Sequence, residues 1–272
     1  AAGNAGAAGN AGAAGNAGAA GNAGAAGAEC PAGGSGGGPS ATGSGTLTGS
    51  ESSQSAGKQA VTVNGQSYVV QGNHKSGSGT LALTYSGTSF TITAQTSDDS
   101  SSVSPASYPS AFIGNNNDWL TADANLPQKV SAITSVPSSW SWSDDGVTGL
   151  YDAVYDVWFT NTASENIVSP DKHLMLWLHK PNAKAPRGSI IGSAIVPGAS
   201  GTWTVWSDGT FISYVSTTKV YSLSFDLRGF ISDAVSRGVL TNSMYLHDVF
   251  AGFEIWSGGV GLHGNCFTAT VK

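Results

Sequence analysis

Short stretches in which apolar and polar residues alternate recur from Lys58 to the end of the chain, separated by residues that favour turns. Alternation with a period of two residues is the pattern of half-buried β-strands. The dipeptide Asn64-Gly65 lies between two such stretches and favours a two-residue hairpin turn. The pattern predicts short strands within residues 59–71, 79–85, 89–96, 129–142, 151–160, 173–178, 189–196, 201–209, 219–227, 247–259 and 266–272.

One segment alone, residues 226–238, has helical periodicity. Its apolar stripe consists of Leu227, Phe230, Ile231, Ala234 and Val235. Asp226 is suited to cap the N-terminus of this helix, and Gly238 is suited to end it. Many strands with one short helix predict an all-β fold, a two-sheet sandwich of the jelly-roll type.

The stretch from residue 173 to residue 179 alternates without a break. One face of the predicted strand carries three leucines. The other face carries His173, Met175, Trp177 and His179. A half-buried strand normally turns polar residues toward water, whereas this one collects an imidazole, a thioether and an indole. The row is therefore suited to line a cleft, with His173 at its head.

The first 27 residues form a repeat with two nested periods. Gly occurs at every third position, from Gly3 and Gly6 to Gly27, and Asn at every sixth: Asn4, Asn10, Asn16 and Asn22. This spacing fits an extended helix of the polyproline-II or polyglycine-II type, which has three residues per turn and no internal hydrogen bonds. Such a tail, reaching roughly 80 Å, needs copies of itself or a groove on a neighbouring subunit to hold its shape.

A disordered low-complexity tether is the alternative interpretation of this repeat. Composition then divides the chain into a repeat tail (1–30), a Gly/Ser-rich linker (31–57) and a folded domain (58–272). All tryptophans, tyrosines and phenylalanines lie in the last of these regions. We therefore expect a single hydrophobic core there.

The charge and polarity of the chain argue against some classes of binding partner and indicate where the protein functions. Charged residues make up 10% of the chain, the net charge is −6 and the pI is about 5.1, which argues against nucleic acid as a partner. No apolar run is long enough to span a bilayer. Low charge with abundant Ser, Thr, Gly and Asn is typical of a secreted β-protein. We expect the Ala-Ala-Gly start to be the mature end left by processing of a secretory precursor.

The two cysteines, Cys30 and Cys266, lie far apart in the sequence. In an oxidising compartment they are candidates for a disulfide within one chain or between neighbouring chains, and two unpaired thiols are the alternative. Nothing in the spacing of histidines, cysteines and acids brings three or four metal ligands together. We therefore expect neither a metal nor a cofactor.

Several stretches of the domain resemble the family-12 glycoside hydrolases, in the order that family has them. These stretches are YVVQGN (68–73), SVPSSWSW (135–142), YDAVYDVWF (151–159), HLMLWL (173–178), TWTVWSDG (202–209), SFDLRGFISDAVSRG (224–238) and AGFEIWSGGVGL (251–262). The resemblance implies a jelly-roll fold with a long concave cleft. It also implies endoglucanase or xyloglucanase activity by two carboxyl groups about 5–5.5 Å apart.

The resemblance places the acid/base at Glu254, within Gly-Phe-Glu-Ile-Trp. It places the nucleophile, a glutamate in that family, at the position of His173. Asp156 matches the family's aspartate beside the nucleophile and is expected to form an Asp–His pair with His173. The resemblance therefore implies a site whose nucleophilic carboxylate is replaced.

The resemblance also concerns sugar-binding side chains. Family members carry a tryptophan shortly after the YVVQGN stretch, where this chain continues HKSGSG without an aromatic residue. The candidate substrate-binding residues on the predicted cleft strands are Trp158, Met175, Trp177, Trp206 and Trp256. Packing of these side chains in the sandwich or in a subunit contact is the alternative.

Three functions follow from these observations. The first is a non-catalytic, secreted structural protein, assembled into a homopolymer such as a filament, sheath or surface layer through residues 1–27. The second is a β-glucan-binding module tethered by its tail. The third is an active endo-β-1,4-glucanase that uses Glu254 with a water or Asp156. The broken carboxylate pair and the periodic tail favour the first.

Overall fold

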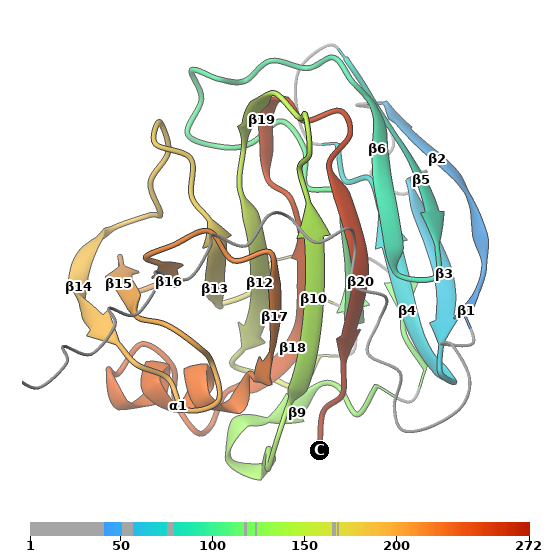
Figure 1. Ribbon diagram of the computed structural model, residues 1–272. Coiled ribbons are helices and arrows are strands. Elements are labelled where there is room, and N and C mark those ends of the chain that lie inside the picture. The colour runs from blue at the N-terminus through green and yellow to red at the C-terminus, as the bar shows by residue number, and fades with distance from the viewer. Residues whose placement is uncertain are drawn as a thin grey trace, which may run out of the picture.

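The computed structural model describes residues 41–50, 57–74, 79–116, 119–122, 124–164, 167 and 169–272. Within these ranges the chain forms two large β-sheets packed as a sandwich, a small two-stranded sheet and one α-helix (Figure 1). The predicted all-β jelly roll with one short helix is therefore confirmed. The repeat of residues 1–27 and Cys30 lie outside the described residues, as does the extended geometry predicted for the tail.

The larger sheet contains twelve strands. Ten of them follow one another in space as β1 (Ala41–Thr42), β3 (Lys58–Val63), β4 (Gln66–Gln71), β7 (Ser110–Asn116), β18 (Tyr245–Gly252), β12 (Ala153–Thr160), β13 (Lys172–His179), β16 (Phe211–Ser216), β15 (Trp203–Ser207) and β14 (Ser189–Ala194). The other two are β8 (Trp119–Leu120), beside β7, and β9 (Gln128–Lys129), beside β18. β13 and β16 pair in parallel, and all other neighbours in this sheet are antiparallel.

The smaller sheet contains six strands, in the order β17 (Ser222–Asp226), β10 (Pro137–Ser143), β20 (His263–Ala269), β6 (Ser89–Gln95), β5 (Thr80–Ser86) and β2 (Ser44–Ser50). The two-stranded sheet joins β11 (Gly149–Tyr151) to β19 (Ile255–Gly258). A short 3₁₀ turn, η1 (Val130–Ala132), precedes β10. The helix is α1 (Arg228–Ser236).

The hydrophobic core lies between the two large sheets. The inner face of the larger sheet supplies Tyr155, Leu174 and Leu176, all fully buried. The smaller sheet supplies Trp140 and Phe267, and the Trp140 and Tyr155 rings meet edge to face with centroids 5.9 Å apart. Alternation along each strand therefore sends one set of side chains into this core.

The predicted turn and helix end are both confirmed. Asn64 and Gly65 have φ values of 52° and 80°, as a hairpin turn of type I′ requires. Gly238 follows the cap of α1 with φ 75°, and its N–H donates to the carbonyl of Val235. The helix starts at Arg228 with Leu227 at the N-cap position, so the predicted cap at Asp226 is one residue too early, although the Asp226 carboxylate accepts the N–H of Arg228 at 2.9 Å.

The boundary predicted at residue 58 lies too late in the chain. Residues 44–50 form β2, which pairs along its whole length with β5, so part of the predicted linker belongs to the sandwich. Its Ser, Thr and Gly residues resemble linker composition, because an edge strand needs few apolar side chains. Among the longer strands, β7 and β16 were not predicted either: all of β7 and the middle of β16 are buried, so apolar–polar alternation is lost.

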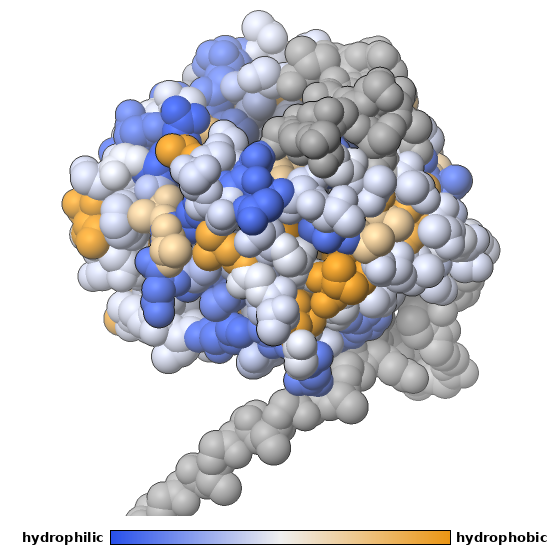
Figure 2. Space-filling view, turned by 90° about the horizontal axis from the view of Figure 1, so that it is seen from above, coloured by the Kyte–Doolittle hydropathy of each residue, from blue (hydrophilic) through white to orange (hydrophobic). Residues whose placement is uncertain are grey.

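Strand β14 forms one edge of the larger sheet and is exposed along most of its length. Ile190 and Ile191 on this strand are 59% and 44% exposed. Arg237 reaches the strand from the end of α1 and donates from Nη2 to the carbonyl of Ser193 at 2.9 Å. In the view of Figure 2, apolar side chains form small separate patches among polar ones.

No helix in the described part of the chain combines the length and apolarity that crossing a bilayer requires. The helix α1 has nine residues and packs at one end of the sandwich, next to β14 and β15 (Figure 1). Its Phe230 ring meets the Trp203 ring edge to face, with centroids 5.1 Å apart.

Candidate active site on the outer face of the larger sheet

The outer face of the larger sheet is the one that points away from the smaller sheet. A row of cross-strand neighbours crosses it from β4 to β14, each residue lying opposite the next. The row consists of Val69, Phe112, Phe250, Asp156, Met175, Ser213, Trp206 and Ile190. Asp156 is therefore the one charged member in the middle of this row.

A second row lies two residues further along each strand, and so on the same face. It consists of Gly114, Asp248, Trp158, His173 and Phe211. Many large side chains of the outer face form a hydrophobic cluster separate from the core between the sheets. Trp158, Trp206 and Phe211 are half-buried and pack against this cluster.

Asp156 and His173 form a hydrogen-bonded pair on this face. Nδ1 of His173 lies 3.0 Å from Oδ1 of Asp156, and the two side chains are 13% and 16% exposed, respectively for the aspartate and the histidine. The second carboxylate oxygen, Oδ2, accepts the indole N–H of Trp158 at 2.7 Å. With Nδ1–H donated to the carboxylate, a neutral imidazole carries its free electron pair on Nε2.

Aromatic neighbours fix the plane of the His173 ring. The ring stacks on Phe211 with centroids 4.0 Å apart and an interplanar angle of 7°. The Trp158 ring meets it edge to face at 5.6 Å. On Phe211 lies the guanidinium of Arg187, 4.7 Å from the ring centroid, a distance typical of a cation–π contact. The imidazole is thus held by a carboxylate at its edge and by rings around it.

Glu254 follows β18 and is anchored through its backbone. Its N–H donates to Oδ1 of the fully buried Asp152 at 2.9 Å, and its carbonyl accepts the N–H of Asp152 at 3.0 Å. Its side chain is half-buried. These two bonds to the backbone of Glu254 fix where the strand ends and where the side chain starts.

Tyr108 connects the two acidic parts of the site. Burial raises its pKa well above the usual value for a phenol, and the negative charges of Asp156 and Glu254 raise it further. Both carboxyl groups therefore lie within electrostatic reach of one phenol. The structure thus pairs His173 with Asp156, and it places Asp156 and Glu254 within electrostatic reach of the same phenol.

The predicted sugar-binding side chains differ in exposure. Trp177, Trp256 and Met175 are 3%, 2% and 6% exposed. The ammonium of Lys184 lies 5.1 Å from the centroid of the Trp256 ring and covers it. Trp158 and Trp206 are half-buried and present part of their rings at the surface of the domain.

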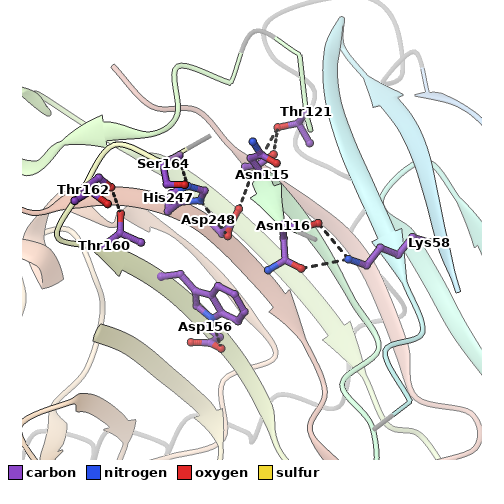
Figure 3. Close-up of polar contacts among 12 residues, drawn as sticks. Lys58, Asn115, Asn116, Thr121, Asp156, Thr160, Thr162, Ser164, His247 and Asp248 are labelled. Carbon is purple, nitrogen blue, oxygen red and sulfur yellow. Dashed lines mark hydrogen bonds and ion pairs between the residues drawn. The ribbon is translucent and has the colours of Figure 1, made fainter. Parts of the chain in front are cut away.

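A buried polar network surrounds His247 and Asp248 on β18 (Figure 3). His247 and Asp248 are fully buried, with Nδ1 of His247 3.4 Å from Oδ2 of Asp248. Oδ1 of Asp248 accepts the N–H of Asn115 at 2.6 Å, and Nε2 of His247 lies 2.5 Å from the carbonyl of Ser164. Gly114 has no side chain to collide with Asp248, where a Cβ atom would lie 2.0 Å from Oδ1.

This network shifts the pKa of both groups. Burial lowers the pKa of His247, but the hydrogen bond and charge of Asp248 raise it more, so the net shift is upward. Burial raises the pKa of Asp248 despite its bond to His247 and the nearby charge of Lys58. Nζ of Lys58 is itself held by Asn116, 3.2 Å from Oδ1.

Neither metal ligation nor a free thiol is found in the described ranges. No group of three or more His, Cys, Asp or Glu side chains there is arranged to hold a metal ion. Cys266 on β20 is 3% exposed and disulfide-bonded. The prediction for Cys30 lies outside the described residues.

An all-β jelly roll with carboxyl groups and half-buried tryptophans on the outer face of its larger sheet has the architecture and side chains expected of a glycoside-hydrolase-type domain. The family model of glycosyl hydrolase family 12 matches residues 47–272, and the chain belongs to this family. This finding confirms the family resemblance noted in the sequence.

Individual relatives agree with this assignment. The chain is 33% identical over 153 residues to a probable cellulase, Cel12b, of Mycobacterium tuberculosis, an alignment that covers 54% of this chain and 98% of the relative. It is 34% identical over 139 residues to a probable xyloglucan-specific endo-β-1,4-glucanase A of Aspergillus terreus, covering 48% of this chain and 54% of the relative. The chain thus spans about half the length of that fungal enzyme.

Solved structures give the same fold. The endoglucanase Cel12A of Rhodothermus marinus matches with a TM-score of 0.67 and 33% identity, over 75% of this chain and 92% of that one. A metagenome-derived endoglucanase of family 12 matches with a TM-score of 0.70 and 29% identity, over 84% of this chain and 98% of that one.

Several residues of the site were not predicted from the sequence. Phe211 lies on the missed strand β16, although FISYVS after the Asp-Gly turn at 208–209 carries the strand pattern. Arg187 and Tyr108 lie outside the strands, and only the folded chain places them beside the pair of His173 and Asp156. Trp119, on β8, packs against the outer cluster as a further half-buried tryptophan.

Proposed function

We propose that the domain binds β-1,4-glucan on the outer face of its larger sheet and does not cleave it by the retaining mechanism. The observation that carries this proposal is the 3.0 Å hydrogen bond between His173 Nδ1 and Asp156 Oδ1. The proposal also rests on the family resemblance of the strand around residues 173–178, in which His173 takes the position of the nucleophilic glutamate. Retaining hydrolysis needs two carboxyl groups about 5–5.5 Å apart, one of which attacks the sugar.

Neither member of the pair is suited to replace that nucleophile. Attack by the imidazole of His173 would give a cationic glycosyl-imidazolium and forfeit the stabilisation that a carboxylate gives to a positively charged transition state. A lost electrostatic group of this kind costs on the order of 3–4 kcal/mol of barrier, and about 1.4 kcal/mol is tenfold in rate. Both oxygens of Asp156 already accept hydrogen bonds, from His173 and from Trp158.

The ligand class follows from the family and from the exposed rings. Trp158 and Trp206 are half-buried, and the apolar face of a glucose ring can stack on an indole that keeps part of its surface exposed. Related proteins are named as cellulase and as xyloglucan-specific endo-β-1,4-glucanase. These observations support an unbranched or xylose-substituted β-1,4-glucan as ligand.

The test combines binding with a restored nucleophile. Calorimetry with cellotetraose and xyloglucan oligosaccharides should detect binding by the wild type, while a reducing-sugar assay should detect no release. His173→Glu should restore hydrolysis, His173→Gln should not, and adding Glu254→Gln to His173→Glu should abolish it again. A wild type that gives no heat at millimolar ligand would contradict binding, and retention of configuration in a wild-type product would contradict the loss of mechanism.

The same pair also favours a second candidate, hydrolysis with inversion. In this reaction Asp156 orients His173, and Nε2 removes a proton from a water whose oxygen attacks the anomeric carbon. Glu254 gives its proton to the departing glycosidic oxygen, so the bond to the leaving sugar breaks as the new C–O bond forms. Proton NMR of the first product would distinguish this candidate, because inversion yields the α-anomer from a β-linked glucan.

The assembly role predicted from the repeat remains a separate proposal. It rests on residues 1–27, and deleting them should abolish any filament, sheath or surface layer seen by electron microscopy. Unchanged assemblies, or a strictly monomeric full-length chain in sedimentation, would count against it. Secretion is likewise proposed, from the low charge of the chain and the disulfide at Cys266.

A further inference from the structure

Two buried side chains on the outer face have neither a hydrogen bond nor an ion pair for their polar atom among the described residues. The two polar groups are the indole N–H of Trp177 and the hydroxyl of Ser213. Trp177 is 3% exposed and Ser213 is fully buried. A buried polar group without a partner costs roughly 1–3 kcal/mol, so native proteins rarely keep two of them close together without a reason.

The two residues are neighbours on adjacent strands. Ser213 on β16 lies opposite Met175 on β13, and Trp177 follows Met175 by two residues on the same face. On its other side Ser213 lies directly opposite Trp206 on β15. Directly opposed residues have Cβ atoms about 4.5–5.5 Å apart. The hydroxyl therefore lies beside the half-buried Trp206.

Comparison with the inner face shows what is particular about this pair. Trp140 and Trp203 also have buried indole N–H groups without a partner among the described residues, but both lie in the core between the sheets. An inner-face N–H can meet no ligand. The outer pair lies in the face that carries Asp156 and His173, where a ligand would arrive.

We infer that Ser213 Oγ and Trp177 Nε1 are the hydroxyl-recognising groups of a sugar subsite whose stacking surface is Trp206. The inference rests on the proposed glucan binding and adds the atoms that contact the sugar hydroxyls. An indole N–H can only donate, whereas a serine hydroxyl donates and accepts. Adjacent equatorial hydroxyls of a glucose ring can accept from the first and exchange a hydrogen bond with the second, while the C–H face stacks on Trp206.

Access to the two atoms requires a side chain at the surface to move. Trp206 and Phe211 are half-buried and pack against the cluster that contains Trp177. Rotamer changes of exposed side chains take picoseconds to nanoseconds, so such a movement adds little delay to binding. The free domain then carries two unpaired polar groups, and bound sugar satisfies them.

This arrangement predicts opposite effects on stability and on affinity. Ser213→Ala removes an unpaired hydroxyl, so it should leave the melting temperature unchanged or raise it, while weakening cellotetraose binding about 3- to 10-fold. Trp177→Phe removes the N–H but keeps an aromatic ring, and should weaken binding to a similar degree. Trp203→Phe is the matched control, because it removes an unpaired indole N–H from the inner face.

Calorimetry with cellotetraose on the full chain and thermal unfolding of the same samples complete the test. The inference holds if Ser213→Ala and Trp177→Phe weaken binding while Trp203→Phe does not. It is overturned if the wild type binds and both outer-face variants bind equally well, a result that leaves glucan binding itself intact. A wild type that binds no oligosaccharide overturns both proposals. Ser213→Ala is small enough to fold whatever the outcome for Trp177→Phe.

Discussion

The two faces of the larger sheet are built from the same strands but differ in what they bury. The inner face is apolar almost throughout and meets the smaller sheet across a continuous core. The outer face also buries large rings, yet it adds the fully buried Asp248 and the largely buried Asp156, together with the unpaired polar atoms of Trp177 and Ser213. Buried charge and unpaired polarity oppose folding, so the inner face must supply the stability that the outer face lacks.

The largest effect is expected from truncating neighbouring residues on β13 that point to opposite faces. Leu176→Ala on the inner face should lower the free energy of unfolding by about 4 kcal/mol, because the surrounding core cannot close the cavity. Met175→Ala on the outer face should cost about 2 kcal/mol, since the half-buried Trp206 and Phe211 can move into the gap. Urea denaturation measures both. A larger loss of unfolding free energy for Met175→Ala than for Leu176→Ala would contradict the inference that the inner face supplies most of the stability.

The second effect concerns the buried charge on the outer face. Asp248→Asn keeps the shape of the side chain but removes the charge that His247 faces, and should lower the free energy of unfolding by about 2 kcal/mol. Asp171→Asn is the control, because that exposed carboxylate also accepts a backbone N–H, from Asn161. Its loss should stay below about 1 kcal/mol. If urea denaturation showed the same loss of unfolding free energy for both variants, the burial of Asp248 would add nothing to the effect of its charge.

The third effect is a pH dependence of the free energy of unfolding, caused by His179 at the edge of the core. Burial lowers the pKa of His179 from 6.5 to about 4, and the nearby Lys219 lowers it as well. Because the pKa of His179 is lower in the folded state than in the unfolded state, the neutral imidazole contributes fully to the free energy of unfolding above pH 6.5. This contribution is lost as the pH falls toward 4. After discounting for partial exposure, unfolding experiments at pH 7 and pH 4.5 should show a loss on the order of 1 kcal/mol. His179→Gln should remove that part of the loss, and an unchanged slope would contradict the assignment.

The smallest effect is expected at the Asp156–His173 pair, whose side chains are both partly exposed on the outer face. A double-mutant cycle with Asp156→Asn and His173→Gln should give a coupling energy of about 1 kcal/mol. A coupling near zero would show that the 3.0 Å contact adds nothing to stability, and would leave its role to ligand binding alone.

The sequence predicted the fold well because alternation marks strands with one polar face. It placed His173 and Asp156 together because a family motif fixes their strands, and the hydrogen bond between them is present. It missed β7 and β16, where burial on both faces removes the alternation. It also missed β2, whose Ser, Thr and Gly residues resemble a linker until β5 is seen beside them.

Contacts made through loops were beyond the sequence for a different reason. The position of Arg187 over Phe211 depends on how the segment after β13 returns to the sheet, and no local pattern encodes that path. The unpaired state of Trp177 and Ser213 is likewise a property of the packed face. Each of these residues looks ordinary in a strand until the positions of all its neighbours are known.

The exposed edge strand β14 has a consequence for how this protein behaves at high concentration. A free strand edge with exposed isoleucines is a template on which another chain can add a strand and start aggregation. In this domain the guanidinium of Arg237 already donates a hydrogen bond to the carbonyl of Ser193. The register shift between Ile190 and Gly192 also interrupts the regular course of β14 along β15. We therefore expect the C-terminal end of α1 to hinder the pairing of β14 with a strand of another molecule at high protein concentration.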